Sequence, residues 1–365
     1  METEYDYLIV GSGMYGSVLA HELNKQGKKV IVVEKREHIG GNCYTDNREG
    51  INVHVYGLHI FHTNKKEIWD YMQQFCEMKP YILNVKAKAQ GKIYNLPFNM
   101  HTFEQVYGVK TVEEAKKVIQ EEINKVYTPE PKNLKEHALN MVGEKIFKLL
   151  IEGYTEKQWH KKCEELPPFI IKRLPFRFEY NNNYFNDAYS GIPIGGYTKL
   201  FENMLKGIEV KTGYDYLKHK GEIKAKKIIF SGPIDQYFDY CYGPLEYRSL
   251  RFESETVDKP YYQDTLVYNY TDKDVPYTRI VEHKYFEQPN TDKTIVTREY
   301  PADWKKGDEP YYPINDDKNN SLYNKYLELA NQNPNVVFRG RLGAYRYNNM
   351  DTTVEMALDD IKNGI

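Results

Sequence analysis

Cysteine is scarce in this sequence, and its four cysteines (Cys43, Cys76, Cys163 and Cys241) stand far apart without a CxxC pair. This spacing argues against a disulfide scaffold and a structural zinc site, and it is typical of reduced thiols in a cytoplasmic protein. No apolar run approaches the roughly 18 residues that a membrane-spanning helix needs. The first residues also lack the basic and apolar segments of a secretion signal. We therefore expect a cytoplasmic protein that uses neither a metal nor a membrane.

An excess of one charge is also missing. The 50 Lys and Arg residues nearly balance the 52 Asp and Glu residues, and the net charge is -2. A protein without a basic field is a poor candidate for binding DNA or RNA, so we expect no nucleic-acid partner. Tyrosine, by contrast, is abundant, with 34 residues against 15 Phe. Such an excess indicates either polar stacking surfaces for ligands or a codon bias, and composition leaves both open.

The first 34 residues have the pattern of a dinucleotide-binding βαβ unit. An apolar run at 5–10 leads into the glycine-rich string GSGMYG at 11–16 and a helical pattern, and a second apolar run at 30–33 ends at Glu34. Glycines in such a turn let the backbone approach a pyrophosphate, to which the helix N-terminus offers unpaired N–H groups. Glu34 is placed to accept hydrogen bonds from the adenosine ribose, and its charge disfavours the 2′-phosphate of NADP.

Two further glycine-rich strings favour FAD over NAD as the dinucleotide. HIGGN at 38–42 follows soon after Glu34, and GRLG at 340–343 follows a short apolar run near the end of the chain. FAD extends its flavin past the pyrophosphate and needs a second glycine-rich turn, and a late strand and helix can close over the flavin. The first and last segments thus predict one discontinuous FAD-binding domain.

Between these segments the sequence pattern changes twice. Residues 101–153 have apolar residues at helical spacing, and residues 245–300 alternate polar residues with strand-forming ones. We predict an α/β fold with a discontinuous Rossmann-like FAD domain, an inserted small helical domain and an antiparallel β-sheet domain that binds substrate. The expected ranges are 1–66, 191–240 and 314–365 for the FAD domain, 101–153 for the helical domain, and 67–100, 154–190 and 241–313 for the sheet domain.

Eight strings connect the chain to a known family. They are YGLHIFHT at 56–63, GYTEKQW at 153–159, LPPFIIKRLP at 166–175, NNYF at 182–185, GGYT at 195–198, DVPYTRI at 274–280, PYYP at 310–313 and GRLG at 340–343. With these strings in this order, the chain resembles the UDP-galactopyranose mutase family of bacterial flavoenzymes. The resemblance implies interconversion of UDP-galactopyranose and UDP-galactofuranose, for cell-surface glycans, through a covalent adduct between the sugar and N5 of the reduced flavin. It also implies a homodimer and NAD(P)H as a transient reductant.

The resemblance assigns roles to individual residues as well. Arg173 and Arg279 would stabilise the charge that develops on the departing diphosphate, because a guanidinium matches phosphate geometry. His62 would lie near the flavin and is the candidate for moving a proton. Substrate contacts would come from Asn84, Ile151, Tyr154, Thr155, Trp159, Tyr184, Asn269, Tyr312 and Tyr347, with Tyr154 on the uracil ring. Cofactor contacts would come from Gly11, Gly13, Tyr15, Gly16, Glu34, Lys35, Asn42, His59, Ile60, Tyr216, Arg341, Asn349 and Met350.

Two positions depart from the family pattern and bear on the choice of substrate. Position 349 is Asn where the family usually has Asp, and Leu58 stands where small residues or proline are common. UDP-N-acetylgalactosamine, with its N-acetyl group at C2, is therefore an alternative substrate. Two rival functions are a flavin amine oxidase-like oxidoreductase and a catalytically idle nucleotide-sugar binder. Arg177 and Arg248 are interpreted as solvated surface charges.

Overall fold

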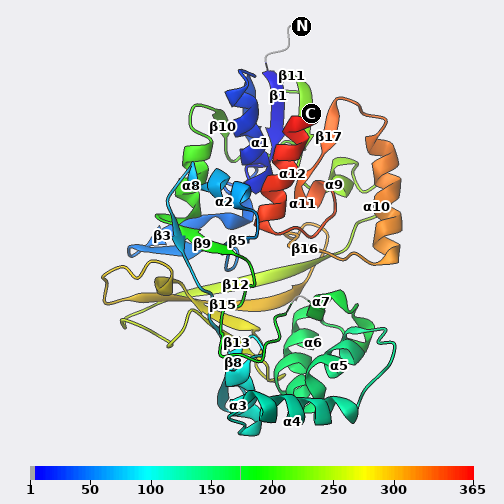
Figure 1. The fold of residues 1–365 in the computed structure, drawn as a ribbon. Helices are drawn as coiled ribbons and strands as arrows, with labels where there is room; N and C mark the ends of the chain where they lie inside the picture. The colour runs from blue at the N-terminus through cyan, green and yellow to red at the C-terminus, as the bar shows by residue number, and fades with distance from the viewer. Residues whose placement is uncertain (1–4, 173) are drawn as a thin grey trace.

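The computed structural model describes residues 5–172 and 174–365. The upper part of the molecule in Figure 1 is built on a five-stranded parallel sheet. In spatial order its strands are β10 (Glu209–Lys211), β2 (Val30–Val33), β1 (Tyr5–Val10), β11 (Ala225–Phe230) and β17 (Val336–Phe338). Strands from the beginning, middle and end of the chain thus lie side by side, as predicted for a discontinuous Rossmann-like domain. Because every pairing is parallel, the carboxyl ends of the strands meet at one edge, where α/β folds bind their ligands.

Helices cover both faces of this sheet, because its central strands are apolar on both sides. α1 (Met14–Lys25), α8 (Gly196–Met204) and α12 (Met350–Lys362) share a buried apolar cluster with Ile9 and Val32. On the other face, α9 (Ile234–Tyr237) and α10 (Asp317–Ala330) share a cluster with Leu8 and Ile31. Neighbouring residues of a strand point to opposite faces, so β1 and β2 each contribute to both clusters. The short helix α11 (Gly340–Gly343) follows β17.

A seven-stranded sheet forms the middle of the molecule. In spatial order its strands are β16 (Tyr312–Pro313), β12 (Tyr247–Val257), β15 (Thr294–Asp303), β14 (Arg279–Glu282), β13 (Val267–Tyr270), β7 (Val85–Ala89) and β8 (Lys92–Leu96). The predicted antiparallel strands between 245 and 300 are confirmed. Among the described strands of this sheet, only β13 and β7 pair in parallel. Two small sheets consist of β3 (Thr45–Arg48) with β4 (Ile51–His54), and of β5 (Phe61–Thr63), β9 (Tyr189–Pro193) and β6 (Met78–Pro80).

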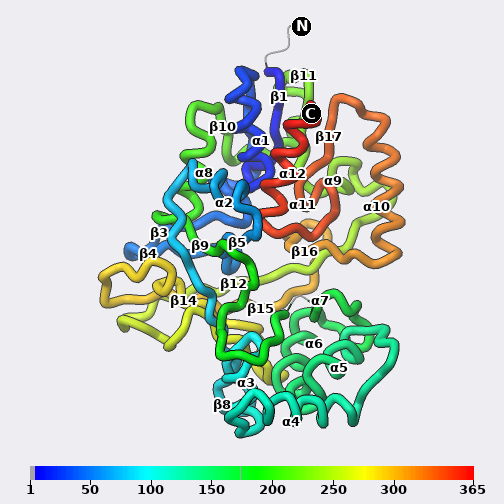
Figure 2. The backbone as a smooth tube through the Cα atoms, in the orientation of Figure 1, coloured from blue at the N-terminus to red at the C-terminus, as the bar shows by residue number. Residues whose placement is uncertain are grey.

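Helices form the lower part of the molecule, as Figures 1 and 2 show. They are α3 (Met100–Tyr107), α4 (Val112–Asn124), α5 (Leu134–Ile146), the π-helical turn η2 (Phe147–Glu152), α6 (Gly153–Trp159) and α7 (Phe169–Lys172). α4 begins at a capping box, in which the backbone N of Glu114 donates to Thr111 Oγ1 and the backbone N of Thr111 donates to the Glu114 carboxylate. The buried residues of α4 and α5 join those of β7 and β8 in one core. Short 3-10 turns are η1 (Gly41–Cys43), η3 (Cys163–Glu165) and η4 (His283–Tyr285).

Two of the predicted domain ranges differ from the packing. α6 and α7 were expected to belong to the sheet domain, yet both are helices, and Ile170 and Ile171 of α7 are buried in the same core as α4 and α5. α2 (Lys66–Gln73) and β6 were expected to belong to the antiparallel sheet, yet Ile68, Trp69, Met72 and Met78 are buried in the cluster that contains α1 and α8. The apolar stripe of α2 packs against β5 and α12 and so belongs to the parallel-sheet part of the molecule. Among the helices of the described residues, none has the length and apolarity to span a membrane. Within the same residues, no group of three or more His, Cys, Asp or Glu side chains is arranged to hold a metal ion.

Candidate functional site

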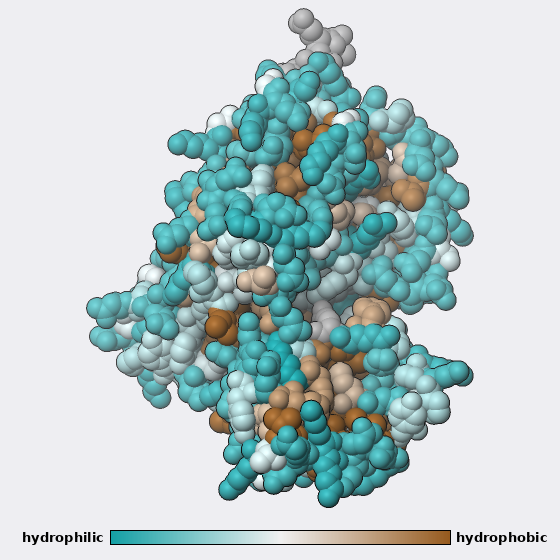
Figure 3. Space-filling view, viewed as in Figure 1, coloured by the Kyte–Doolittle hydropathy of each residue, from teal (hydrophilic) through white to brown (hydrophobic). Residues whose placement is uncertain are grey.

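A cavity of about 1150 Å³ lies where the parallel sheet, the antiparallel sheet and the helical part meet. Figure 3 shows a hollow between the upper and lower parts of the molecule. A pocket for one small ligand has a typical volume of about 300–1,000 Å³. The cavity therefore has room for an extended dinucleotide together with a second ligand.

Most of the predicted site residues line this cavity. From the predicted cofactor set they are Gly11, Gly13, Tyr15, Gly16, Glu34, Lys35, Asn42, His59, Ile60, Tyr216, Arg341, Asn349 and Met350. From the predicted substrate and catalytic sets they are His62, Ile151, Tyr154, Thr155, Trp159, Tyr184, Asn269, Arg279, Tyr312 and Tyr347. The structure does not bring Asn84 into the cavity wall: its side chain is exposed, and its backbone carbonyl accepts a hydrogen bond from Thr265 Oγ1. Arg173 lies outside the described residues.

The glycine turn between β1 and α1 is too tight for side chains. A Cβ on Gly11, whose φ is +105°, would lie 2.2 Å from Ser231 Oγ, and a Cβ on Gly16 would lie 2.0 Å from the carbonyl oxygen of Gly11. α1 begins without a side-chain cap, and no acidic residue stands in its first turn. Its first N–H groups are therefore available to an anionic ligand at the cavity wall, where the helix dipole also favours negative charge.

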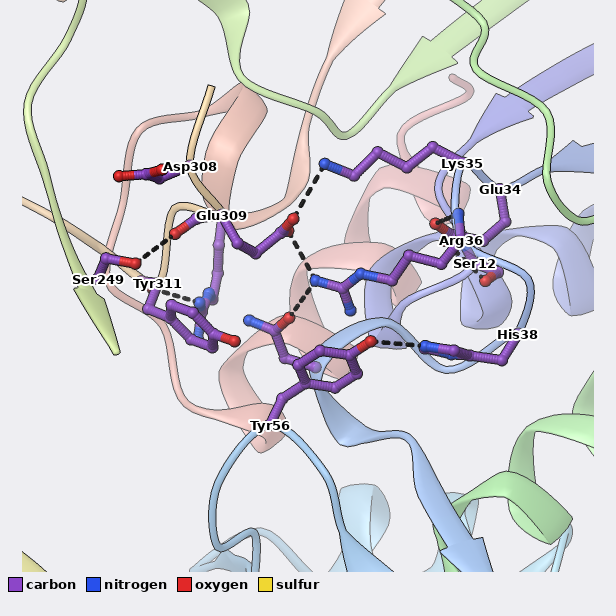
Figure 4. Close-up of polar contacts among 12 residues, drawn as sticks. Ser12, Glu34, Lys35, Arg36, His38, Tyr56, Ser249, Asp308, Glu309 and Tyr311 are labelled. Carbon is purple, nitrogen blue, oxygen red and sulfur yellow. Dashed lines mark hydrogen bonds and ion pairs between the residues drawn. The ribbon is translucent and has the colours of Figure 1, made fainter. Parts of the chain in front are cut away.

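Glu34 follows β2 at the same edge of the sheet, and protein donors hold its carboxylate in place (Figure 4). Oε2 accepts hydrogen bonds from the backbone N and the Oγ of Ser12, at 3.0 and 2.9 Å. Oε1 accepts one from the backbone N of Arg36 at 3.0 Å. A carboxylate oxygen has two acceptor positions, so Oε1 can accept a further hydrogen bond from a ribose hydroxyl.

Arg36 and Glu309 form a polar cluster beside Glu34 that the sequence analysis missed (Figure 4). Arg36 Nη2 donates to Glu309 Oε1 at 2.6 Å and to Asn42 Oδ1 at 2.9 Å, while Lys35 Nζ donates to Glu309 Oε2 at 3.1 Å. The guanidinium lies over the Tyr56 ring, 4.1 Å from its centroid. Burial raises the pKa of Glu309, but Arg36 and Lys35 outweigh burial and hold it below its ordinary value. Arg36 Nη1 is buried and has no hydrogen-bond partner among the described residues, so it is available to a ligand.

The opposite wall of the cavity belongs to the antiparallel sheet. Arg279 in β14 lies between Asn269 in β13 and Glu299 in β15, its neighbours in the strand register. Arg279 Nη2 donates to Glu299 Oε1 at 2.8 Å, and Glu299 is 2% exposed. Within the described part of the chain, Arg279 Nε, Glu299 Oε2 and Asn269 Oδ1 are buried without a hydrogen-bond partner. Such atoms are rare in folded proteins, and they indicate a ligand that both donates and accepts hydrogen bonds.

Aromatic side chains complete this end of the cavity. α6 contributes Tyr154 and Trp159, and Trp159 Nε1 is another buried atom without a partner among the described residues. The rings of Tyr312 and Tyr347 have their centroids 5.7 Å apart. Burial raises the pKa of Tyr312 to about 12, so its hydroxyl keeps its proton at neutral pH and can donate it in a hydrogen bond. The wall thus offers ring faces for stacking and O–H donors for an anion.

The two histidines of the YGLHIFHT string differ in their surroundings. His62 Nδ1 lies 2.9 Å from Asp187 Oδ2, and Phe185 stacks on its ring with centroids 3.9 Å apart. These contacts fix the orientation of the His62 ring, and the role of His62 in proton transfer stays a prediction. Burial lowers the pKa of His59 to about 4, so its imidazole is neutral at pH 7. His59 Nδ1 donates to the carbonyl oxygen of Gly57 at 2.8 Å, which leaves Nε2 as an acceptor.

The interpretation of Arg248 and Arg177 as solvated surface charges is wrong. Arg248 is 8% exposed, pairs with Asp303 Oδ1 at 2.6 Å and donates from Nη2 to the carbonyl oxygen of Gln158 at 3.0 Å. Arg177 is half-buried and donates to the carbonyl oxygen of Asn183 at 2.7 Å, beside Tyr184. Both arginines hold segments of the cavity wall. Their partners are mostly backbone carbonyls, which every residue carries, so no sequence signal marks them.

Comparisons with known proteins agree with this geometry. A family model described as UDP-galactopyranose mutase matches residues 149–347, and one described as an NAD(P)-binding Rossmann-like domain matches residues 9–75. The chain is 41% identical to a probable UDP-galactopyranose mutase of Klebsiella pneumoniae over 358 residues, which are 96% of this chain and 92% of that protein. It is 40% identical to a dTDP-fucopyranose mutase of Escherichia coli over 363 residues, which are 96% of each protein.

Among solved structures, a crystal structure of reduced UDP-galactopyranose mutase matches the fold with a TM-score of 0.76. The match covers 98% of this chain and 96% of that one at 15% sequence identity, so it supports the fold alone. Membership of the family rests on the sequence matches, which span nearly the whole chain. The chain belongs to the UDP-galactopyranose mutase family and is an isomerase.

Proposed function

We propose that this protein interconverts the pyranose and furanose forms of UDP-galactose, with reduced FAD bound at the glycine turn. The proposal rests on the observation that a single cavity contains both a site for a dinucleotide and a site for a polar second ligand. The glycine turn and Glu34 line one part of it, and Arg279, Asn269 and Trp159, each with a buried polar atom unpaired among the described residues, line another. The relative from Klebsiella pneumoniae supports the same substrate class. The furanose product would supply cell-surface glycans.

The residues at the glycine turn fit FAD. Gly11 and Gly16 leave no side chain between the turn and a pyrophosphate, and Glu34 Oε1 has an acceptor position for the ribose. Gly41 packs so closely against the glycine turn that a Cβ on Gly41 would lie 3.0 Å from Gly13 Cα. The second glycine string therefore lies directly beside the first. FAD, when bound and reduced, supplies the nucleophile of the proposed covalent mechanism, and NAD(P)H is the proposed source of its electrons.

The chain's own residues bind the UDP group and stabilise its charge. Negative charge grows on the diphosphate as its bond to the anomeric carbon breaks. Arg279 is positioned to stabilise this charge by donating hydrogen bonds to the phosphate oxygens. Glu299 fixes the plane of the Arg279 guanidinium through the 2.8 Å hydrogen bond, while Arg279 Nε keeps an N–H group without a partner among the described residues. A donor held in place in a buried site stabilises such charge more strongly than the same donor in water. Tyr312 would donate its hydroxyl to the diphosphate, and Tyr154 would stack on the uracil.

A dTDP-fucose is a second candidate substrate, because the relative from Escherichia coli is a dTDP-fucopyranose mutase and matches over 96% of both chains. Both candidates join a pyrimidine nucleoside diphosphate to the anomeric carbon of a sugar. The stabilisation of diphosphate charge by Arg279 would therefore serve either one. The two differ in the nucleoside and in the hydroxyl group at C6 of the sugar, so a direct comparison of the two substrates decides between them.

An anaerobic assay tests the proposal. Protein loaded with FAD is incubated with UDP-galactofuranose, with dTDP-fucofuranose or with the 2-acetamido analogue of the UDP-sugar, each with and without dithionite. We expect UDP-galactopyranose to form when the flavin is reduced and not when it is oxidised. A higher kcat/KM for the dTDP-sugar would assign the second substrate, and absence of turnover with all three would contradict the proposed isomerisation. NADPH in place of dithionite tests the reductant.

Glu309→Gln is expected to speed the dissociation of FAD by about two- to tenfold, because charge-assisted hydrogen bonds are stronger than neutral ones. The carboxylate is shared by Arg36 and Lys35 and holds the segment around residue 309 against the cofactor end of the cavity. The rate is measured as the recovery of free FAD fluorescence after dilution. Glu37→Gln is the matched control, because Glu37 is an exposed carboxylate in the loop after β2 that carries Lys35 and Arg36. Equal dissociation rates for wild type and Glu309→Gln would show that this ion pair does not retain the cofactor.

A further inference from the structure

Lys157 lies on α6, in the string GYTEKQW, and it is not among the residues that line the cavity. Its Nζ donates to the backbone carbonyl oxygens of Tyr270, Asp272 and Val275, at 2.9, 2.9 and 2.8 Å. An ammonium group has three N–H donors, so these carbonyls occupy all of them. The lysine therefore ties α6 to the turn between β13 and β14.

Other contacts join the same two segments. Thr271 Oγ1 donates to the carbonyl oxygen of Leu149 at 2.8 Å, in the π-helical turn η2 that leads into α6. A Cβ on Gly153 would lie 2.1 Å from the carbonyl oxygen of Thr271, so the backbones of the helix and the turn approach each other directly. On the exposed side, Lys273 pairs with Glu156 at 2.8 Å. We call Lys157 together with the turn 270–275 the bracket.

The bracket connects two walls of the substrate end of the cavity. α6 carries Tyr154, Thr155 and Trp159, which all line the cavity. The turn leads from β13, which holds Asn269, to β14, which begins at Arg279. The distance between the aromatic wall and the guanidinium thus depends on how α6 lies against the turn.

α6 needs such support because it is short and follows an irregular segment. The helix has seven residues, and η2 before it is π-helical over six residues, a geometry rare in proteins and frequent at functional sites. Its far end is held separately by Arg248, which donates to the carbonyl oxygen of Gln158. Burial lowers the pKa of Lys157 to about 8, with Asp272 and Asp274 opposing that fall, so the ammonium form with its three donors prevails at pH 7.

We propose that Lys157 is a positioning residue for the nucleotide-sugar site, which holds Tyr154 and Trp159 at the distance from Arg279 that a bound UDP-sugar spans. The inference rests on the proposed function and deepens it, because it assigns part of the nucleotide affinity to a residue that does not line the cavity. Residues outside a binding site can act in this way, because the side chains that bind a ligand must be held within about 0.5 Å of their productive positions by the contacts behind them.

Lys157→Met tests the proposal. It keeps most of the apolar stem and removes the three donors. We expect KM for the UDP-sugar and Kd for UDP to rise about tenfold, while kcat falls by less than about threefold and the amount of bound FAD is unchanged. A role confined to fold stability would reduce the fraction of active enzyme, which lowers the apparent kcat and leaves KM and Kd unchanged.

Two variants and one further measurement accompany this test. Lys273→Met removes an exposed lysine from the same turn, and we expect its KM and Kd to stay within about twofold of wild type, as for exposed ion pairs in general. Thr271→Val removes one weaker contact of the bracket and should shift KM and Kd in the same direction by a smaller factor. Amide hydrogen exchange, which needs no substrate, should be faster over residues 150–160 in Lys157→Met than in wild type.

The outcomes separate this inference from the proposed function. A Lys157→Met protein with KM and Kd like those of Lys273→Met, or with unchanged exchange over residues 150–160, would overturn the positioning role. If wild type turned over none of the sugars and did not bind UDP, the proposed function would fail instead. The exchange measurement would then still show whether Lys157 holds α6 against the turn.

Discussion

Arg279→Lys is expected to lower kcat for UDP-galactofuranose by about 100- to 1,000-fold, the range found when one preorganised donor to a developing oxyanion is removed. Lysine keeps the positive charge but loses the planar group that places several N–H donors around a phosphate. Arg279 lines the cavity and keeps Nε without a partner among the described residues, so the donors lost are those free to bind the diphosphate. The absorbance spectrum of the bound flavin should not change, because the glycine turn and Glu34 are untouched.

Lysine is a better test here than alanine because of Glu299. That carboxylate is 2% exposed and pairs with Arg279 at 2.8 Å, and alanine would leave it as an uncompensated buried charge. Breaking a buried ion pair in this way costs about 3–5 kcal/mol of folding free energy, so lost activity could then reflect unfolding. Single-turnover measurements with the reduced enzyme separate the chemical step from the binding of substrate.

Arg298→Lys is the matched control for Arg279→Lys. Arg298 precedes Glu299 in β15 and therefore points to the opposite face of the sheet, where it pairs with Glu255 at 2.9 Å. The same change of side chain there should leave kcat within about twofold of wild type, since ion pairs at partly exposed positions contribute little. A kcat for Arg279→Lys close to that of Arg298→Lys would remove Arg279 from the proposed stabilisation of the diphosphate.

Gly16→Ala is expected to yield protein with less than about a tenth of the wild-type FAD content, because close-packed interiors do not absorb an added methyl group without shifting. The new Cβ would lie 2.0 Å from the carbonyl oxygen of Gly11, a backbone atom that cannot rotate away, and 3.2 Å from Ile9 Cγ2. α1 must then move off β1, and its N-terminal N–H groups move with it. The ratio of flavin to protein absorbance after purification measures the loss.

Gly27→Ala controls for the general effect of replacing a glycine. A Cβ at Gly27 meets nothing within 4 Å, but the residue has a φ of +77°, so alanine there costs about 1 kcal/mol of folding free energy through backbone strain alone. We expect a lower melting temperature for Gly27→Ala with its full content of FAD. Full FAD content in Gly16→Ala would contradict the proposed fit of a pyrophosphate at the glycine turn.

Local patterns in the sequence predicted the elements well, because each depends on neighbouring residues. The GSGMYG string predicted a strand, a tight turn and a helix, and β1, Gly11 and α1 have this arrangement. The alternating residues after 245 predicted antiparallel strands for the same kind of reason, since a strand with one face in the core repeats every two residues. The packing of one segment on another was harder to predict. α2 was expected to join the antiparallel sheet, but its buried residues lie in the cluster with those of α1 and α8.

Several residues of the candidate site were predicted because they lie inside distinctive strings. Tyr154, Trp159 and Arg279 were named from such strings, and all three line the cavity. Asn84 has a less distinctive neighbourhood, and the structure places its side chain in solvent. Glu309 was missed, and Arg248 was interpreted as a surface charge, because each acts through partners far away in the chain.

The sequence by itself determined that this chain forms the glycine turn of a Rossmann-like domain, which mutase family it belongs to, and most of the predicted residues that the structure brings to one cavity. These features are encoded in short strings whose residues act within a few positions of each other. Only the tertiary structure decided that Glu299 holds Arg279, that Glu309 pairs with Arg36, and that Lys157 ties α6 to the turn 270–275. The physical reason is that these contacts join segments far apart in the chain, and several of the acceptors are backbone carbonyls that no side-chain pattern distinguishes.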